Sequence, residues 1–399
     1  MQLSQLRNIV PLLATVILSV AMLNVWILST VQDQSSNTLF DTVPFHHIER
    51  TAPPTEPLPK VRRLPLSKTS EHHIPRPPLD SIVQGWNVTG DASWLLNFAI
   101  IGFPKCGTSS LMYHLQSHPQ VQIFSDERCD MSYNQHVTLI RDLYKNFSVH
   151  DDRIARGIKC PLDLENTKLA MPNYQWLFPR TNYIVGIRHP VLWFESFYNF
   201  RIHNRFSMPP PGDLVGRCRR GGFNVCTFRG NFHLFLSNLG KTHMATDPDE
   251  QQYLAPEFRH TRDPIVKLPG KTPQKIFLYE VSQLSDPDPD RAADLRTTLQ
   301  SFLNLTIPLD PMIWYRPGKQ HKNQWELERL NAKKINICDA QHEALRTVLR
   351  YQAGNASRWI RHYFLDAPDV VTSSKEYLRN IILPSWERDP CLDRALSMS

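Results

Sequence analysis

The residues best suited to chemistry lie at 97–119, in the stretch NFAIIGFPKCGTSSLMYHLQSHP. It has the pattern of an apolar strand, a tight turn and a helix. Backbone N–H groups at the start of such a helix converge on an anion, and the helix dipole adds to their attraction. Gly107 permits a close backbone approach and Lys105 supplies a full charge. An ordinary capped helix is the alternative, but the pattern predicts an anion site formed by Lys105, Cys106, Gly107, Thr108, Ser109 and Ser110.

The order of residues in this turn differs from that of a nucleoside-triphosphatase phosphate loop. In that loop the lysine directly follows a glycine and is followed by a magnesium-binding hydroxyl residue. Here Lys105 precedes Gly107, and we expect no later strand to end in an acid placed like the metal-binding aspartate of those enzymes. A magnesium-dependent kinase is therefore the weaker interpretation, and we expect no metal.

A second anion-binding pattern lies in NYIVGIRHPVLWFESFYNF, which begins at Asn182. Arg188 ends a strand, Pro190 suits the first turn of a helix, and Ser196 lies eight residues after the arginine. A guanidinium can bind a phosphate through two hydrogen bonds, and the serine can donate another. The alternative is an arginine paired with a surface carboxylate and a serine that faces a neighbouring helix. Together with the first turn, the pattern predicts a second phosphate site.

These two motifs resemble those of a known family. PKCGTSSL resembles the 5′-phosphosulfate loop of sulfotransferases, and RHPVLWFESFY resembles their 3′-phosphate motif. The resemblance covers roughly residues 97–399 and implies a P-loop-like sulfotransferase fold. It also implies the co-substrate 3′-phosphoadenosine-5′-phosphosulfate (PAPS), whose two phosphate ends would account for two anion sites.

The resemblance also implies a catalytic carboxylate. Sulfotransferases of the heparan type place a glutamate beyond the loop, after a His-Pro pair, and this glutamate falls at Glu127 here. A carboxylate near the acceptor hydroxyl can act as a general base. Asp126 is its immediate rival, and a solvated acidic loop is the alternative. The family usually has a His-Phe-Phe-like stretch next, which is Arg-Cys-Asp-Met at 128–131 in this chain.

A further lysine follows from the same resemblance. GIKCPL resembles the family's Glu-Lys-Ser/Thr-Pro strand end, so that Lys159 would lie near the transferred sulfonate, with Ile158 in place of the usual glutamate. A solvated lysine at a strand end is the alternative.

The elements that must position these residues alternate along the chain. Four apolar runs predict buried strands, namely LLNFAIIGF, ARGIKC, NYIVGIRH and KIFLYEVSQL. Helical patterns occur between and after them, at 109–117, 191–205, 231–239, 290–303 and 339–351. This alternation predicts an α/β fold, a parallel β-sheet flanked by helices, with the ligand at the carboxyl ends of the strands.

The N-terminal part predicts a membrane anchor. Residues 9–29 form an uncharged apolar run long enough to span a bilayer. The flanking charges favour a cytoplasmic tail at 1–8, with a cleaved signal peptide as the alternative. Residues 30–92 are rich in Pro, Ser and Thr and predict a disordered lumenal stem, which leaves 93–399 as the lumenal sulfotransferase domain. We expect a single-pass type II Golgi membrane protein.

Composition agrees with this placement. The net charge of +7 suits an anionic ligand without requiring one. Seven cysteines leave at least one thiol unpaired, and we predict the disulfides Cys218–Cys226 and Cys338–Cys391, although connectivity cannot be derived from sequence. Four sequons, at Asn87, Asn146, Asn304 and Asn355, are usable glycosylation acceptors in the lumen.

The sequence therefore predicts a Golgi-type carbohydrate sulfotransferase. It would move a sulfonate from PAPS to a hydroxyl or amine of a glycan by in-line transfer, with a carboxylate as general base. A protein-tyrosine acceptor and a lumenal nucleotide- or glycan-binding protein without turnover remain open alternatives. The expected partners are a glycan or polysaccharide acceptor and the membrane, with no nucleic acid. Neither the acceptor sugar nor the oligomeric state follows from the sequence.

Overall fold

The computed structural model describes residues 75–147, 153–218, 225–239, 274–312 and 324–392. The predicted tail, the predicted membrane span and most of the predicted stem lie outside these residues. Within the described ranges, no helix has both the length and the apolar character that crossing a membrane requires.

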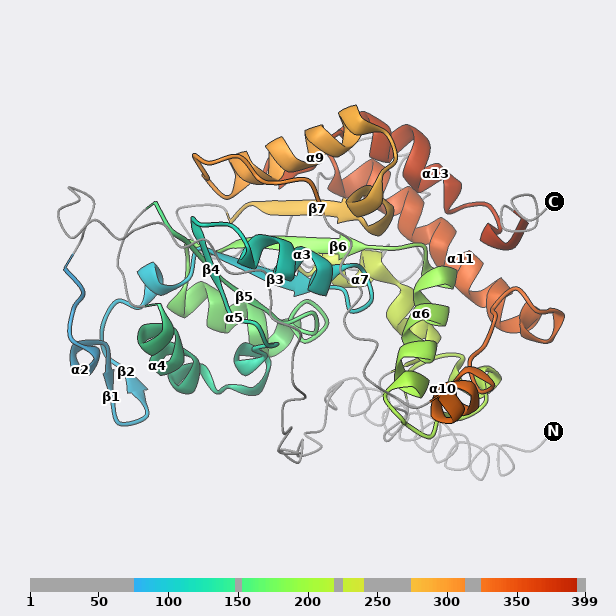
Figure 1. The fold of residues 1–399 in the computed structure, drawn as a ribbon, viewed down its shortest axis with the longest axis horizontal. Coiled ribbons are helices and arrows are strands. Elements are labelled where there is room, and N and C mark those ends of the chain that lie inside the picture. Colours follow the sequence, from blue (N-terminus) through green and yellow to red (C-terminus); the bar gives the residue numbers. More distant parts are fainter. Residues whose placement is uncertain (1–74, 148–152, 219–224, 240–273, 313–323, 393–399) are drawn as a thin grey trace, which may run out of the picture. The chain divides into compact units, whose positions relative to one another are not determined.

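A six-stranded parallel sheet forms the centre of the fold (Figure 1), with the strand order β4-β5-β3-β6-β7-β8. The strands are β3 (Phe98–Gly102), β4 (Val121–Ile123), β5 (Ala155–Lys159), β6 (Asn182–Ile187), β7 (Ile276–Glu280) and β8 (Val370–Val371). Every residue of β3, β5 and β7 is buried, as expected for strands covered on both faces. The four predicted strands are confirmed as β3, β5, β6 and β7. Strands β4 and β8 escaped prediction because two or three residues cannot display a period.

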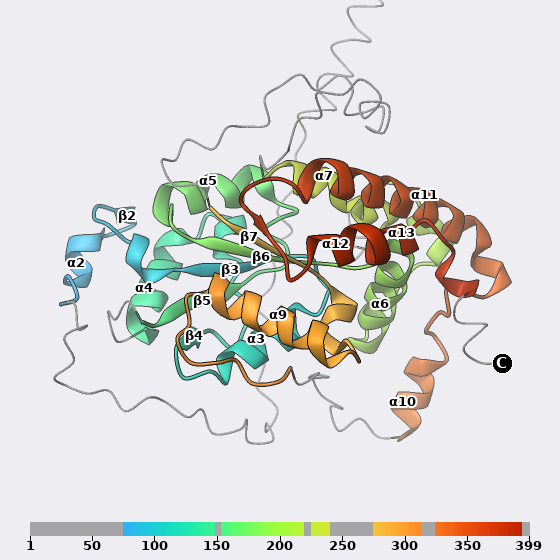
Figure 2. The same cartoon turned by 90° about the horizontal axis from the view of Figure 1, so that it is seen from above.

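Helices cover both faces of the sheet (Figure 2). The helices are α2 (Leu79–Ile82), α3 (Thr108–Gln116), α4 (His136–Asn146), α5 (Thr167–Leu177), α6 (Pro190–His203), α7 (Phe232–Ser237), α9 (Pro289–Phe302), α10 (Gln324–Asn331), α11 (Glu343–Trp359), α12 (Lys375–Tyr377) and α13 (Leu383–Ser385). Alternate residues of β3 face two separate cores. Phe98 and Ile100 pack with α3 and α9, whereas Ala99 and Ile101 pack with α4, α5, α7 and α11. The predicted α/β class is confirmed.

Residues 79–88, which the sequence places in the stem, are folded. Helix α2 leads into a hairpin of β1 (Val83–Gln84) and β2 (Asn87–Val88). Ile82 and Val83 are buried in the same core as α4. Elements of two to four residues have no detectable period, which explains why composition alone suggested a stem.

Three disulfides link described segments: Cys129–Cys160, Cys218–Cys226 and Cys338–Cys391. The last two were predicted and are confirmed, whereas the first was not predicted. Cys106, in the turn after β3, is a buried free thiol.

Candidate active site

The turn between β3 and α3 is held by side chains from neighbouring strands and helices. Three successive carbonyls accept hydrogen bonds: that of Pro104 from Trp193 Nε1 at 2.8 Å, that of Lys105 from Arg188 Nη1 at 3.3 Å and that of Cys106 from the Tyr279 hydroxyl at 2.9 Å. Carbonyl oxygens repel anions, so their engagement with donors removes an obstacle to anion binding.

The same turn leaves the start of helix α3 open. Lys105 and Gly107 have φ of 67° and 77°, in the left-handed region, and Gly107 caps the helix without any side-chain cap. The first N–H groups of a helix have no partner within the helix and are available to an anion. A Cβ on Gly107 would lie 2.4 Å from Leu284 Cδ1, so the position favours glycine both for its φ and for its space.

The Lys105 side chain is half-buried and lies close to another cation, the Arg188 guanidinium. Its Nζ lies 3.9 Å from the centroid of the Phe200 ring. Burial, and then the nearby Arg188 guanidinium, lower the pKa of Lys105 to about 8. A bound anion would counter the second effect and stabilise the charged form.

Lys159, at the end of β5, connects the turn at residues 103–110, here called the anion turn, to the predicted carboxylate of Glu127. Its Nζ donates to Ser109 Oγ at 2.8 Å and lies 2.9 Å from Glu127 Oε1. The Lys159 side chain is 3% exposed, whereas that of Glu127 is 54% exposed. The rival acid, Asp126, is also exposed. Three residues singled out from separate parts of the sequence therefore meet in space.

Arg188 follows β6 at the same edge of the sheet. Its Nε is buried and has no hydrogen-bond partner among the described residues. A buried donor without a partner is unfavourable, and a bound anion would supply the missing acceptor. Ser196 lies half-buried about two turns into α6, the helix that Pro190 begins. His189 fixes the start of that helix, because its Nδ1 accepts a hydrogen bond from the Val191 N–H at 3.2 Å.

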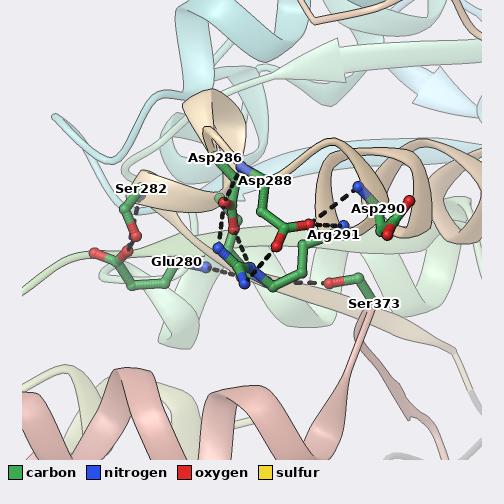
Figure 3. A network of polar contacts seen from close by, with 8 residues as sticks. Glu280, Ser282, Asp286, Asp288, Asp290, Arg291 and Ser373 are labelled. Carbon is green, nitrogen blue, oxygen red and sulfur yellow. Dashed lines mark hydrogen bonds and ion pairs between the residues drawn. The ribbon is translucent and has the colours of Figure 1, made fainter.

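Strand β7 ends in an acid, the buried Glu280, whose carboxylate is engaged by neighbouring hydrogen-bond donors (Figure 3). It accepts hydrogen bonds from the N–H of Ser282, at 2.8 Å, and from the Ser282 hydroxyl, and the Glu280 N–H donates to the Gln283 side chain. The acids that follow, Asp286 and Asp288, both bind Arg291. Among the residues that the structure describes, no cluster of three or more His, Cys, Asp or Glu side chains could hold a metal.

Two further arginines near the site escaped the sequence analysis. Arg229 forms a buried ion pair with Glu165, with Nη2 2.7 Å from Oε1. The Arg201 guanidinium lies 5.1 Å from the Phe197 and Phe206 ring centroids. Burial, and then Arg229, lower the pKa of Arg201 to about 10, while Glu127 opposes them. A lone arginine on a helix face carries no motif, so no sequence signal distinguishes Arg201 from a solvated residue.

Together, these contacts place cations at the ends of three adjacent strands. Lys105 follows β3, Lys159 ends β5 and Arg188 follows β6, and β3 pairs with both of the other strands. Because the strands are parallel, their carboxyl ends form one edge. This arrangement can hold an anion with more than one phosphate and presents the Glu127 carboxylate beside it.

Comparisons with known proteins add one structural likeness. No family model and no curated protein matches the chain. Among solved structures, the chain is similar to a sulfotransferase from Alicyclobacillus acidocaldarius, with 15% sequence identity and a TM-score of 0.42. The match covers 73% of this chain and 99% of that one. Similarity at this level carries no conclusion about activity, which must be argued from the site.

Proposed function

We propose that the chain is a PAPS-dependent sulfotransferase that transfers a sulfonate to a hydroxyl or amine of a glycan. One observation carries the proposal: Lys159 Nζ contacts both Ser109 Oγ in the anion turn and the Glu127 carboxylate. A group that binds an anion and a group that can accept a proton are thereby brought to one point, as group transfer to a hydroxyl requires.

The residues around the turn fit the two ends of PAPS. The 5′-phosphosulfate would be bound by Lys105, Cys106, Gly107, Thr108, Ser109 and Ser110, and the 3′-phosphate by Arg188 and Ser196. The uncapped start of α3 and the unpartnered Nε of Arg188 support this assignment. Both provide donors that an anion would satisfy.

In the proposed reaction, PAPS supplies the sulfonate and a phosphate leaving group. The acceptor oxygen forms a new S–O bond in line with the S–O bond that breaks, and its proton passes to the Glu127 carboxylate. Lys105 and Lys159 stabilise the negative charge that develops on the leaving phosphate and the sulfonate. We assign the base to Glu127 rather than Asp126 because Glu127 has the contact with Lys159.

Isothermal titration of the full-length chain tests the cofactor. We expect the product analogue 3′-phosphoadenosine-5′-phosphate to bind without metal, and Lys105→Ala and Arg188→Ala each to lower its affinity at least tenfold. A preference for magnesium–ATP would instead favour the kinase interpretation. Binding of the bisphosphate without transfer to any glycan or tyrosine acceptor would favour the non-enzymatic alternative.

We also propose that this domain lies in the Golgi lumen on a single N-terminal membrane helix. Three predicted glycosylation sites, Asn87, Asn146 and Asn304, are exposed, which is compatible with glycans. Asn355 lies within α11, and the Ser357 of its sequon is fully buried. Glycosidase treatment of single Asn→Gln variants is expected to reveal glycans at the exposed sites and none at Asn355, whereas a chain without glycans would oppose lumenal placement.

A further inference from the structure

The loop that carries Glu127, residues 124–132 and here called the carboxylate loop, is attached to the end of β5 at several points. The Arg128 N–H donates to the Lys159 carbonyl at 2.8 Å. Cys129 and Cys160 form a disulfide with a Cα–Cα distance of 5.0 Å. Farther along, Ser132 Oγ donates to Asp163 Oδ1 at 2.6 Å.

These attachments lie directly beside the proposed catalytic pair. Cys129 is two residues after Glu127, and Cys160 is the residue after Lys159. The disulfide and the Glu127–Lys159 ion pair therefore close one small ring that joins the loop to the strand end. Cys160 is fully buried and Cys129 is half-buried, so the disulfide anchors a surface loop to the core.

We propose that the Cys129–Cys160 disulfide is a positioning group, which holds the Glu127 carboxylate at Lys159 and thereby sets the rate of sulfonate transfer. Nucleotide binding does not depend on it, because the anion turn is held by Trp193, Arg188 and Tyr279 instead. The inference rests on the proposed function. The Glu127 side chain is half-exposed, and its ion pair with Lys159 keeps its position only while the loop stays close to the end of β5. Loss of the disulfide would let the loop move away, and the carboxylate would then leave the acceptor.

The test compares two disulfide variants of the full-length chain. Cys129→Ser/Cys160→Ser is expected to lower kcat about 100-fold, while the dissociation constant for 3′-phosphoadenosine-5′-phosphate and the KM for PAPS stay within about threefold. The matched control, Cys338→Ser/Cys391→Ser, removes a different disulfide. It should leave the dissociation constant, the KM and kcat within about threefold of the wild-type values. A kcat retained by the first variant would overturn the proposal.

A second readout separates positioning from general destabilisation. Glu127→Gln should lower kcat at least 100-fold in the wild-type background but less than about fivefold in the Cys129→Ser/Cys160→Ser background, because the carboxylate is already misplaced there. Full additivity would overturn the proposal. If the double variant loses bisphosphate binding, Ser132→Ala removes a milder attachment and should lower kcat severalfold with unchanged affinity, whereas an unchanged kcat would overturn the proposal.

Failure of the proposed function has a different signature. A wild-type chain that binds the bisphosphate but transfers no sulfonate would overturn the function itself. Hydrogen exchange of residues 125–131 would then decide the structural part. Faster exchange in Cys129→Ser/Cys160→Ser than in Cys338→Ser/Cys391→Ser would support the anchoring role of the disulfide, and equal exchange would overturn it.

Discussion

The anion turn, residues 103–110, and the carboxylate loop, residues 124–132, lie beside each other but are held differently. Every residue of the turn is buried or half-buried, and three of its carbonyls accept hydrogen bonds, from Arg188 after β6, Trp193 in α6 and Tyr279 in β7. The loop exposes Ser125, Asp126 and Glu127 and depends on a disulfide and an ion pair to the end of β5.

This difference suggests that the two regions serve different steps, the turn in nucleotide binding and the loop in turnover. A turn with no exposed residue and two left-handed residues has few alternative conformations, so we expect the proposed anion site to be preorganised. An exposed loop with a few attachments can move at its tip, where the proposed glycan acceptor would enter. Changes in the turn should therefore act on nucleotide binding, and changes in the loop should act on turnover.

The largest expected effect is that of Glu127→Gln. Loss of a general base lowers kcat about 10²- to 10⁴-fold, and affinity for the bisphosphate should stay within about threefold. Steady-state kinetics and calorimetry together measure both constants. Asp126→Asn is the matched control and should leave kcat near the wild-type value. The opposite pattern in the two variants would transfer the catalytic role to Asp126.

Gly107→Ala tests the turn. The left-handed φ of 77° and the approach of the new Cβ to Leu284 should together destabilise the turn by about 2 kcal/mol and lower bisphosphate affinity about 30-fold. Gly212→Ala is the control, because no atom lies within 4 Å of a Cβ placed there. Calorimetry measures the affinity for the bisphosphate, and steady-state kinetics measures kcat. A Gly107→Ala variant with normal bisphosphate affinity and a lowered kcat would contradict the assignment of the turn to nucleotide binding.

The two regions also differ in how well the sequence predicts them. The turn lies within one strand–turn–helix segment, so a local pattern is enough to predict Lys105 and Gly107 as anion-binding residues. The same holds for Arg188, which follows β6. A turn that must bind an anion requires particular residue types at neighbouring positions, and these can be recognised in the sequence.

The carboxylate loop depends on contacts between residues distant in sequence. Glu127 was placed only by resemblance, and its contact with Lys159 requires β4 and β5 to pair. The Cys129–Cys160 disulfide spans 31 residues, and no spacing rule distinguishes it from other pairings. Arg201 was not predicted for the same reason, because its proximity to Arg229 and Glu127 depends on which elements pack around α6.

Asp163 allows a pH test of the carboxylate loop. Burial raises the pKa of this carboxyl to about 7, against the hydrogen bonds from Ser132 and Tyr174 that lower it. A folded-state pKa above the unfolded value means that its contribution to stability is present at low pH and is lost as pH rises through about 7. The free energy of unfolding should therefore fall by roughly 2 kcal/mol between pH 5 and pH 8 relative to Asp163→Asn. Urea unfolding of the wild-type protein and of Asp163→Asn measures this free energy across the pH range. A difference between the two proteins that does not change with pH would contradict the raised pKa of Asp163.

Lys105 gives the smallest expected effect, in the anion turn. Its ammonium must be charged to attract a phosphate, and its pKa is about 8 in the free protein. Bisphosphate affinity should thus be nearly constant below this pH and fall about tenfold between pH 7 and pH 9, because phosphate groups are already ionised in that range. Lys105→Arg is the control, since a guanidinium stays charged and should bind without this decline. The same decline in Lys105→Arg would assign it to another group.

The pH dependence of Lys105 also tests whether the two regions are independent. The Glu127 carboxylate raises the pKa of Lys105, although burial has the larger and opposite effect. Glu127→Gln removes that negative charge, so the midpoint of the affinity decline should move to lower pH while affinity at neutral pH changes little. A midpoint that stays in place would mean that the carboxylate loop and the anion turn act separately. A shifted midpoint would mean that the carboxylate assigned to proton transfer also sets the pKa of the lysine assigned to the leaving phosphate.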